Sequence, residues 1–294
     1  MWAIILHGGA KTIENEDSSA NRAGCKQALQ AGIAVLARGC SSIDAAEAAV
    51  RALENNRTFN AGRGSTPNVD GRVETCAAIM EGRGLNIGAI AAARRILNPI
   101  SVAKAMLFEK PVLLAGEGAT RFALEAGLPL CSPQEMEELR ETRPVQESRH
   151  DTVGCLALDH QGTLAAAVST GGLQGTLPGR VGDSPLPGCG FYCDDQVGGV
   201  VFSGDGEEIA RTMLGARVMQ ALKELSPRTA VEEALTYMKR VGGEAGGIVL
   251  TKDGQLGWAH NSDHFAVAHA SSANPVPKIY LKQTEERHDE REGF

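Results

Sequence analysis

The chain has 294 residues, of which 43% are hydrophobic and 22% charged, so its length and composition allow a full buried core in one large domain. A formal net charge of −7 argues against nucleic-acid binding. Seven cysteines without a Cys-x-x-Cys pair favour reduced thiols in the cytoplasm over a disulfide framework. The sequence contains no apolar run of membrane-spanning length and no signal-peptide pattern, so we expect no membrane partner.

The first half of the chain is predicted to mix helices and strands. A buried strand opens it at residues 2–6, and helical spacing follows over 21–38 and 41–53, with Ser41 or Ser42 as N-cap of the second helix. A loop rich in glycine and asparagine is expected over 59–71. The remaining elements are a strand at 73–80, a strand turning into a helix at 85–97, a helix at 101–108, a strand at 112–115 and a helix at 118–126.

Residues 132–150 are strongly charged and poor in apolar residues, which predicts a linker with a helical piece at 134–140. Beyond it, strands are expected at 153–158, 164–168, 198–202, 247–250 and 264–268, and helices at 207–225 and 229–241. The tail after Ser271 is polar and expected to fray at its end. Strands grouped apart from helices favour an α+β fold with antiparallel sheets.

Thr152 opens an apolar segment directly after the polar residues Arg149, His150 and Asp151. A threonine hydroxyl is a weak nucleophile unless a base lies beside it, and an N-terminal threonine has such a base in its own α-amine. The reference pKa of an α-amine is roughly 7.7–8.0, so part of it is neutral near physiological pH. Thr152 acquires that amine only if the Asp151–Thr152 peptide bond is cut.

Four segments in this order and spacing resemble the plant-type (type III) L-asparaginase/isoaspartyl aminopeptidase family of N-terminal nucleophile hydrolases. They are HGGA at 7–10, FNAGRG at 59–64, HDTVG at 150–154 and GRVGDSP at 179–185. The resemblance implies a four-layer αββα sandwich and self-cleavage by an N-to-O acyl shift. It further implies an α chain of residues 1–151, a β chain of residues 152–294 and a homodimer of cleaved units.

The resemblance also assigns roles to individual residues. It makes Thr152 the nucleophile, Thr170 a second threonine that positions it, and Asn60 a supporting residue near it. Asparagine and β-aspartyl peptides both carry an α-carboxylate and an α-ammonium. A planar guanidinium matches the α-carboxylate, and a carboxylate holds the α-ammonium. The resemblance assigns the first role to Arg180 and the second to Asp183.

The segment from Ser203 to Glu207 follows a predicted strand and opens a helix, where a hydroxyl and a backbone N–H can form an oxyanion hole. The resemblance gives Ser203 and the Gly204 amide this role and has Gly206 help hold the substrate amine. Ser203 stands where the family usually has threonine, and Asp205 adds a negative charge near the site.

Further departures from the family pattern occur near the predicted site. Lys11 stands where a glycine is common, while Cys76 and Glu81 replace two usual aspartates. We expect these changes to affect kinetics or specificity rather than the fold.

No cofactor is expected. Relatives bind Na⁺ or K⁺ through backbone carbonyls of a loop that corresponds to residues 53–61 here. By that analogy the ligands would be the carbonyls of Leu53, Glu54, Phe59 and Ala61. The spacing of His260, His264 and His269 does not match a metal motif.

Two alternatives remain open from the sequence. One is a hydrolase like glycosylasparaginase, which shares the His-Asp-Thr start and a similar RVGDSP stretch. The other is an uncleaved member of the same fold that acts as a binding protein. Cleavage at Thr152 and turnover of small asparagine-like substrates separate these possibilities.

Overall fold

The computed structural model describes residues 1–132, 135 and 152–292. In this part of the chain, eight strands form one sheet in the order β12-β11-β1-β5-β6-β2-β3-β4, and four form a second in the order β10-β9-β8-β7. The larger sheet contains β1 (Ala3–Lys11), β2 (Thr75–Glu81), β3 (Asn86–Ala93), β4 (Leu113–Ala115), β5 (Val153–Leu158), β6 (Leu164–Thr170), β11 (His264–Ser271) and β12 (Lys278–Tyr280). The smaller contains β7 (Phe191–Asp194), β8 (Gly198–Gly204), β9 (Ala245–Thr251) and β10 (Leu256–His260).

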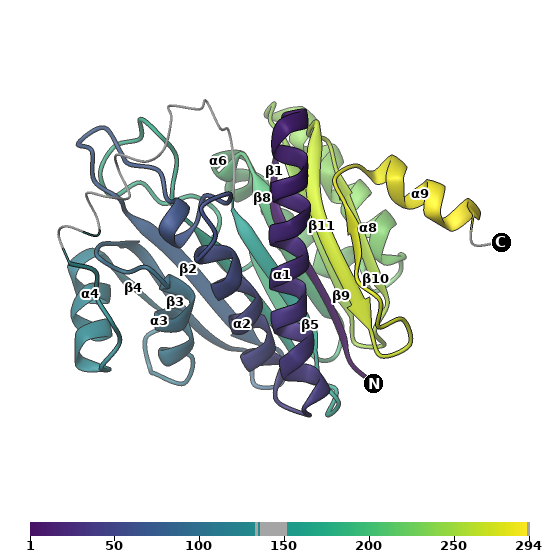
Figure 1. Ribbon diagram of the computed structural model, residues 1–294, viewed down its shortest axis with the longest axis horizontal. Helices are drawn as coiled ribbons and strands as arrows, with labels where there is room; N and C mark the ends of the chain where they lie inside the picture. The colour runs from purple at the N-terminus through teal and green to yellow at the C-terminus, as the bar shows by residue number, and fades with distance from the viewer. Residues whose placement is uncertain (133–134, 136–151, 293–294) are drawn as a thin grey trace.

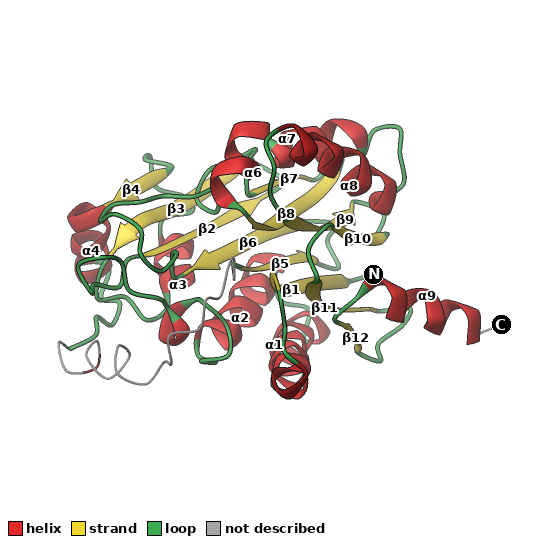
Figure 2. Ribbon diagram, turned by 90° about the horizontal axis from the view of Figure 1, so that it is seen from above, coloured by secondary structure: helices red, strands yellow, loops and turns green. Residues whose placement is uncertain are grey.

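Helices cover the outer face of each sheet, as Figure 2 shows. Those on the larger sheet are α1 (Ser18–Ala37), α2 (Ser42–Glu54), α3 (Pro99–Ala105) and α4 (Gly116–Glu125). Those on the smaller sheet are α6 (Gly206–Thr212), α7 (Leu214–Ala221) and α8 (Pro227–Leu235), followed by the 3₁₀ turn Thr236–Arg240. A last helix, α9 (Gln283–Glu292), projects near the C-terminus (Figure 1).

Three apolar cores separate the four layers. Along β1, Ile4 packs in the core beneath α1 and α2, whereas its neighbour Ile5 packs between the sheets. Along β8, Val201 points between the sheets and Val200 points toward α7 and α8. Because successive side chains of a strand point to opposite faces, each sheet is buried on both sides. The predicted four-layer αββα sandwich is confirmed.

Most of the predicted elements are present, with some shifted ends. Ser41 is the N-cap of α2, and its hydroxyl accepts the N–H of Asp44 as the sequence suggested. The predicted strand at 153–158 has the same bounds in the structure. The predicted linker, including its helical piece at 134–140, lies almost entirely outside the described residues.

Several boundaries were predicted wrongly, for local backbone reasons. The strand at 85–97 does not become a helix: β3 ends at Ala93, and Ala92 and Arg95 have positive φ values of 47° and 64°. The single helix expected at 207–225 is two helices, because Met213 between them is left-handed with φ 52°. The helix expected at 229–241 ends at Leu235 and tightens into a 3₁₀ turn.

The polar tail after Ser271 forms two elements, and its last two residues, where fraying was expected, lie outside the described residues. Strand β12 pairs with β11, and α9 is held by hydrogen bonds to the body of the protein. Glu286 accepts the indole N–H of Trp258 at 2.9 Å, and Asp289 accepts the hydroxyl of Tyr280 at 3.0 Å. Strands β7 and β10 were missed by the sequence analysis, since each is only four or five residues long.

Candidate active site

Thr152 lies immediately before β5, in the middle of the larger sheet. Strand β5 pairs with β1 on one side and β6 on the other, both antiparallel. Val153 pairs with Ser169, so the same register brings Thr152 opposite Thr170 at the end of β6. Thr152 is only 6% exposed. Its predicted cleavage partner, Asp151, lies outside the described residues.

The hydroxyl of Thr152 contacts that of Ser184 at 3.2 Å in a buried position. Ser184 immediately follows Asp183 in the loop between β6 and β7. The contact therefore links the predicted nucleophile directly to the predicted substrate-binding loop. Ser184 is not among the predicted site residues, because a contact between residues 32 positions apart leaves no local pattern in the sequence.

Asn60 holds the turn that follows Thr170. Its side-chain amide donates to the carbonyl of Gly172 at 2.6 Å, and its own carbonyl accepts the N–H of Gly171 at 2.7 Å. Its side-chain oxygen accepts both the N–H and the hydroxyl of Thr66. Asn60 thus supports the site by fixing the backbone next to Thr170 rather than by touching Thr152.

The three residues predicted to bind substrate lie together. A Cβ atom added to Gly206 would be 2.8 Å from Oδ1 of Asp183 and 3.0 Å from Nη2 of Arg180. A side chain larger than hydrogen at position 206 would therefore collide with both charged groups. An amino acid carries its carboxylate and ammonium on one carbon, so its recognition requires a cation and an anion this close together.

Asp183 is buried, and its Oδ2 has no hydrogen-bond donor among the described residues. Burial raises the pKa of its carboxyl to about 7, although the nearby Arg180 guanidinium acts in the opposite direction. A buried carboxylate without a partner is costly, so such an atom is expected to receive a donor from a ligand.

Ser203 and Gly204 end β8, next to the end of β1. The Ser203 hydroxyl is fully buried and accepts the N–H of Ala10 at 3.1 Å, which leaves its own proton available for donation. Gly204 has φ 150° and packs so closely on the carbonyl of Glu244 that a Cβ would lie 2.2 Å from it. The carboxylate of Asp205 accepts the N–H of Glu244 at 2.7 Å, so this departure has a local structural partner.

His7 lies beneath the nucleophile strand. It pairs with Gly154 across β1 and β5, and a Cβ on Gly154 would be 2.5 Å from its Nε2. Burial lowers the pKa of His7 to about 3, despite a backbone contact with Thr152 that raises it. The ring is therefore neutral at physiological pH and supplies no positive charge to the site.

Of the other departures, Cys76 is nearest to the site. It pairs with Thr170 across β2 and β6, and its sulfur accepts the N–H of Ala92 at 3.4 Å. Burial raises the pKa of its thiol to about 11, so it stays uncharged near Arg180 and Asp183. Lys11 is buried with its ammonium 6.0 Å from the centre of the Phe59 ring.

Glu81, the second replaced aspartate, is farther along β2. Its carboxylate caps the turn between β2 and β3 by accepting the Gly84 N–H at 2.6 Å and the Asn86 amide at 3.0 Å. This is a structural role at the turn.

Backbone carbonyls do gather in the loop after α2. A Cβ on Gly62 would lie 2.6 Å from the carbonyl oxygen of Glu54 and 2.5 Å from that of Leu97. The carbonyls of Phe59 and Ala61 each accept one backbone N–H, from Ala61 and Gly64 respectively. The Leu53 carbonyl accepts the N–H groups of Asn55 and Asn56.

The histidines near the C-terminus do not form a metal site. Within the residues that the structure describes, no group of three or more His, Cys, Asp or Glu side chains is arranged to hold a metal ion. Burial lowers the pKa of His269 to about 4, and His260 stacks on Trp258 with ring centres 5.9 Å apart.

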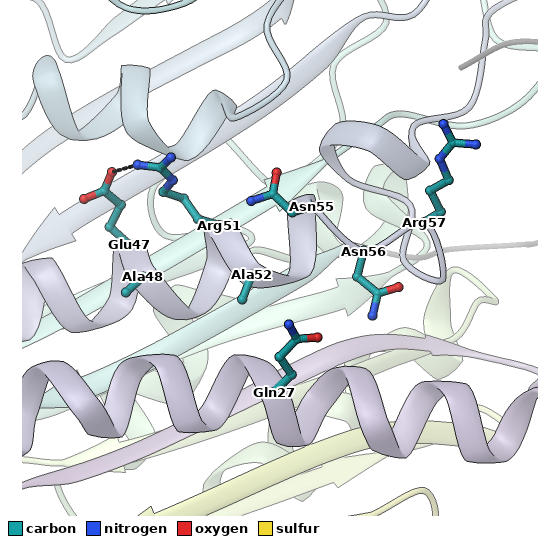
Figure 3. Close-up of a pocket in the computed structure, with 8 residues that line it drawn as sticks. All are labelled: Gln27, Glu47, Ala48, Arg51, Ala52, Asn55, Asn56 and Arg57. Atoms are coloured by element: carbon teal, nitrogen blue, oxygen red, sulfur yellow. Dashed lines mark ion pairs between the residues drawn. The ribbon is translucent and has the colours of Figure 1, made fainter. Parts of the chain in front are cut away.

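A groove of about 640 Å³ opens elsewhere, between α1 and α2 (Figure 3). Its lining is polar and includes Gln27 of α1 and the ion pair between Arg51 and Glu47 of α2. None of the predicted site residues lines it. In the described part of the chain, no helix is long and apolar enough to span a membrane.

The comparisons with known proteins agree with the resemblance seen in the sequence. The family model described as asparaginase matches residues 1–143 and 132–277. An isoaspartyl peptidase/L-asparaginase of Danio rerio is 37% identical, with 90% of this chain and 95% of the relative covered. Those of Xenopus laevis (38% identical; 94% and 98% covered) and Homo sapiens (37% identical; 90% and 92% covered) are similar. The chain therefore belongs to the asparaginase family of hydrolases.

Proposed function

We propose that this protein hydrolyses the side-chain amide of L-asparagine and the β-aspartyl bond of isoaspartyl dipeptides, with Thr152 as an N-terminal nucleophile. The observation that carries the proposal is that the charged groups of Arg180 and Asp183 lie close together at Gly206, with Asp183 followed by Ser184, which contacts the Thr152 hydroxyl. Relatives of similar length are named isoaspartyl peptidase/L-asparaginase.

In the proposed maturation, the Thr152 hydroxyl attacks the carbonyl carbon of Asp151. The new C–O bond replaces the peptide C–N bond, and the proton from the hydroxyl goes to the released amine of Thr152. Water then hydrolyses the ester, which leaves a free carboxylate on Asp151 and a free hydroxyl on Thr152. The resulting α-amine is the base that this buried threonine otherwise lacks.

In the proposed turnover, the α-amine of Thr152 accepts the hydroxyl proton while Oγ1 attacks the substrate amide. The Ser203 hydroxyl and the Gly204 N–H would stabilise the oxyanion, which in an enclosed site contributes strongly to the rate. Ammonia or an amino acid leaves with the proton, and water hydrolyses the β-aspartyl ester. Arg180 and Asp183 would restrict the reaction to substrates with a free α-carboxylate and α-amine.

The first test combines mass measurement with an alanine variant of the nucleophile. We expect purified wild-type protein to give two fragments, the second beginning Thr152-Val153-Gly154, and to release ammonia from asparagine. Thr152→Ala should remain one chain and be inactive, because the variant has no hydroxyl. Thr229→Ala, on the exposed start of α8, should cleave and react like wild type. A wild-type chain that stays intact and inactive would favour the binding-protein alternative.

A separate assay distinguishes the two hydrolase alternatives. Asparagine and β-aspartyl-leucine should be turned over, whereas a glycosylated asparagine should react poorly. Rapid release of the sugar amine with slow turnover of asparagine would favour the glycosylasparaginase-like alternative.

We also propose that the loop after α2 binds an alkali cation through backbone carbonyls, chiefly that of Glu54. The convergence of carbonyl oxygens beside Gly62 supports this, since hard cations prefer such ligands. A bound ion would stabilise the folded state and would help hold Asn60 in place. A melting temperature that is the same in potassium, sodium and choline chloride of equal ionic strength would contradict the proposal.

The compartment and the assembly state are part of the same proposal. All seven cysteines are free thiols, which suits the cytoplasm, and the family resemblance supports a homodimer of cleaved units. Cell fractionation tests the cytoplasmic location, and light scattering on the mature protein tests the homodimer.

A further inference from the structure

Glu207 holds one edge of the Arg180 guanidinium. Nε of Arg180 donates to Oε1 of Glu207 at 2.8 Å, and Nη2 donates to Oε2 at 2.6 Å. Glu207 lies in the first turn of α6, whereas Arg180 lies in the loop between β6 and β7. Two parallel hydrogen bonds fix both the position and the plane of a guanidinium. The arginine side chain is therefore oriented by a second element.

A second edge of the same guanidinium, formed by Nη1 and Nη2, is available to another carboxylate. Nη1 has no hydrogen-bond acceptor among the described residues, and the Nη2 atom lies with Oδ1 of Asp183 around the Gly206 position. Gly182 covers the guanidinium, because a Cβ there would be 2.9–3.1 Å from three of its atoms. With Nε and Nη2 bound to Glu207, a ligand carboxylate can still pair end-on with Nη1 and Nη2.

We propose that Glu207 is a positioning residue that turns the free edge of Arg180 toward the α-carboxylate of the substrate. This inference rests on the proposed function, because it concerns the same substrate site. The alternative is that Glu207 competes with the substrate, by binding the Arg180 guanidinium in place of the substrate carboxylate. Glu207 binds the edge formed by Nε and Nη2 and leaves the edge formed by Nη1 and Nη2. The carboxylates of Glu207 and of the substrate can therefore bind the guanidinium at the same time.

Glu207 also contributes charge to the site. The charged groups that act on the Asp183 carboxyl are Arg180 from its own loop and Glu207 from α6. The thiols of Cys76 on β2 and Cys189 also lie near it, and the charge of Asp183 raises their pKa values. Glu207 raises the pKa of Asp183, since two negative charges lie near each other. Removing this charge should lower the pKa of Asp183, an effect that a purely structural residue would not produce.

The experiment compares Glu207→Gln with Glu208→Gln, its neighbour in α6, which pairs with the exposed Arg211 instead. Three ligands separate the contacts: asparagine, succinamate (which lacks the α-amine) and 3-aminopropanamide (which lacks the α-carboxylate). For Glu207→Gln we expect KM for asparagine and the inhibition constant of succinamate to rise about tenfold, with kcat within about threefold. Well above pH 7, where Asp183 is ionised in both proteins, inhibition by 3-aminopropanamide should not change, and Glu208→Gln should match wild type throughout.

The acid limb of the kcat/KM profile should also move to lower pH in Glu207→Gln. A lower KM in this variant would overturn the proposal, because it would make Glu207 a competitor of the substrate. Equal weakening of both analogues would do the same, since it would indicate general damage to the loop. If wild type does not hydrolyse asparagine, the proposed function fails separately. In that case the affinity for L-aspartate, measured by calorimetry, tests the role of Glu207. An affinity of Glu207→Gln equal to that of wild type would refute the positioning role.

Discussion

Asp183 illustrates how a single residue can be placed for binding at the expense of stability. Its carboxyl is fully buried beside Arg180, one oxygen has no donor among the described residues, and burial raises its pKa to about 7. Only the ionised form can hold an α-ammonium. The group should therefore bind substrate well above pH 7 and lose it progressively below.

The uncharged variant Asp183→Asn separates the contribution of Asp183 to substrate binding from its cost to stability. Below pH 4 this carboxyl is protonated in both the folded and the unfolded chain. Between pH 4 and about 7 it ionises only in the unfolded chain, so the wild-type protein loses folding free energy as the pH rises through this window. Asp183→Asn should thus gain stability between pH 5 and pH 8, on the order of 2–4 kcal/mol. Its asparagine turnover should nevertheless be lost.

Denaturant unfolding at several pH values measures the gain in stability of Asp183→Asn over wild type. Asp253→Asn, at an exposed surface site, is the control and should show no such gain. A constant difference between the Asp183 variant and wild type across this range would contradict the raised pKa.

At the scale of secondary-structure elements, the C-terminal end of α2 is fastened to the end of β6 by one buried carboxyl. Glu54 accepts the hydroxyl of Ser169 at 2.7 Å, the N–H of Ile100 at 2.9 Å and the amide of Asn98 at 3.1 Å. Burial raises its pKa to about 8, with these donors acting in the opposite direction. Ser169 precedes Thr170, so this contact connects helix packing to the geometry of the site.

Removing the Ser169 hydroxyl tests that connection. Ser169→Ala should reduce the free energy of unfolding by about 1–3 kcal/mol, because a buried acceptor loses a donor. Ser101→Ala removes a hydroxyl bond of equal length, to Glu47, nearer the surface, and should cost less than about 1 kcal/mol. If both variants unfold at the same denaturant concentration, Glu54 does not fasten these elements.

The sequence was most informative where a pattern is local. The strand that begins directly after Thr152 and the helix that begins after Ser203 follow from short-range hydrophobic and capping patterns. The pairing of Arg180 with Glu207 and the contact of Thr152 with Ser184 join residues far apart in the chain, so periodicity carries no trace of them. The break at Met213 was also not predictable, because methionine is an ordinary helix former and gives no signal of a left-handed backbone.

At the scale of the whole molecule, the two segments on either side of Thr152 share one sheet. Strands β1 to β4 come from the segment before Thr152, and β5, β6, β11 and β12 come from the segment after it. They alternate in space, so that β11 pairs with β1, β1 with β5, and β6 with β2. Three antiparallel strand pairs therefore cross between the segments.

This arrangement predicts that cleavage does not separate the fragments. An affinity tag on either fragment should recover both in equal amounts from native buffer, because each is held by three ladders of backbone hydrogen bonds and a shared core. In denaturant the tagged fragment should be recovered alone. Loss of the partner under native conditions would contradict the interleaved sheet.

The position of β1 has a consequence for how the protein is made on the ribosome. Residues 3–11 are translated long before both of their neighbours in the sheet, β5 and β11. Until then β1 has two unpaired edges and two apolar faces, and such strands template aggregation. Nascent chains that end before β5 should accordingly depend on chaperones, whereas full-length chains can complete the sheet and only then mature.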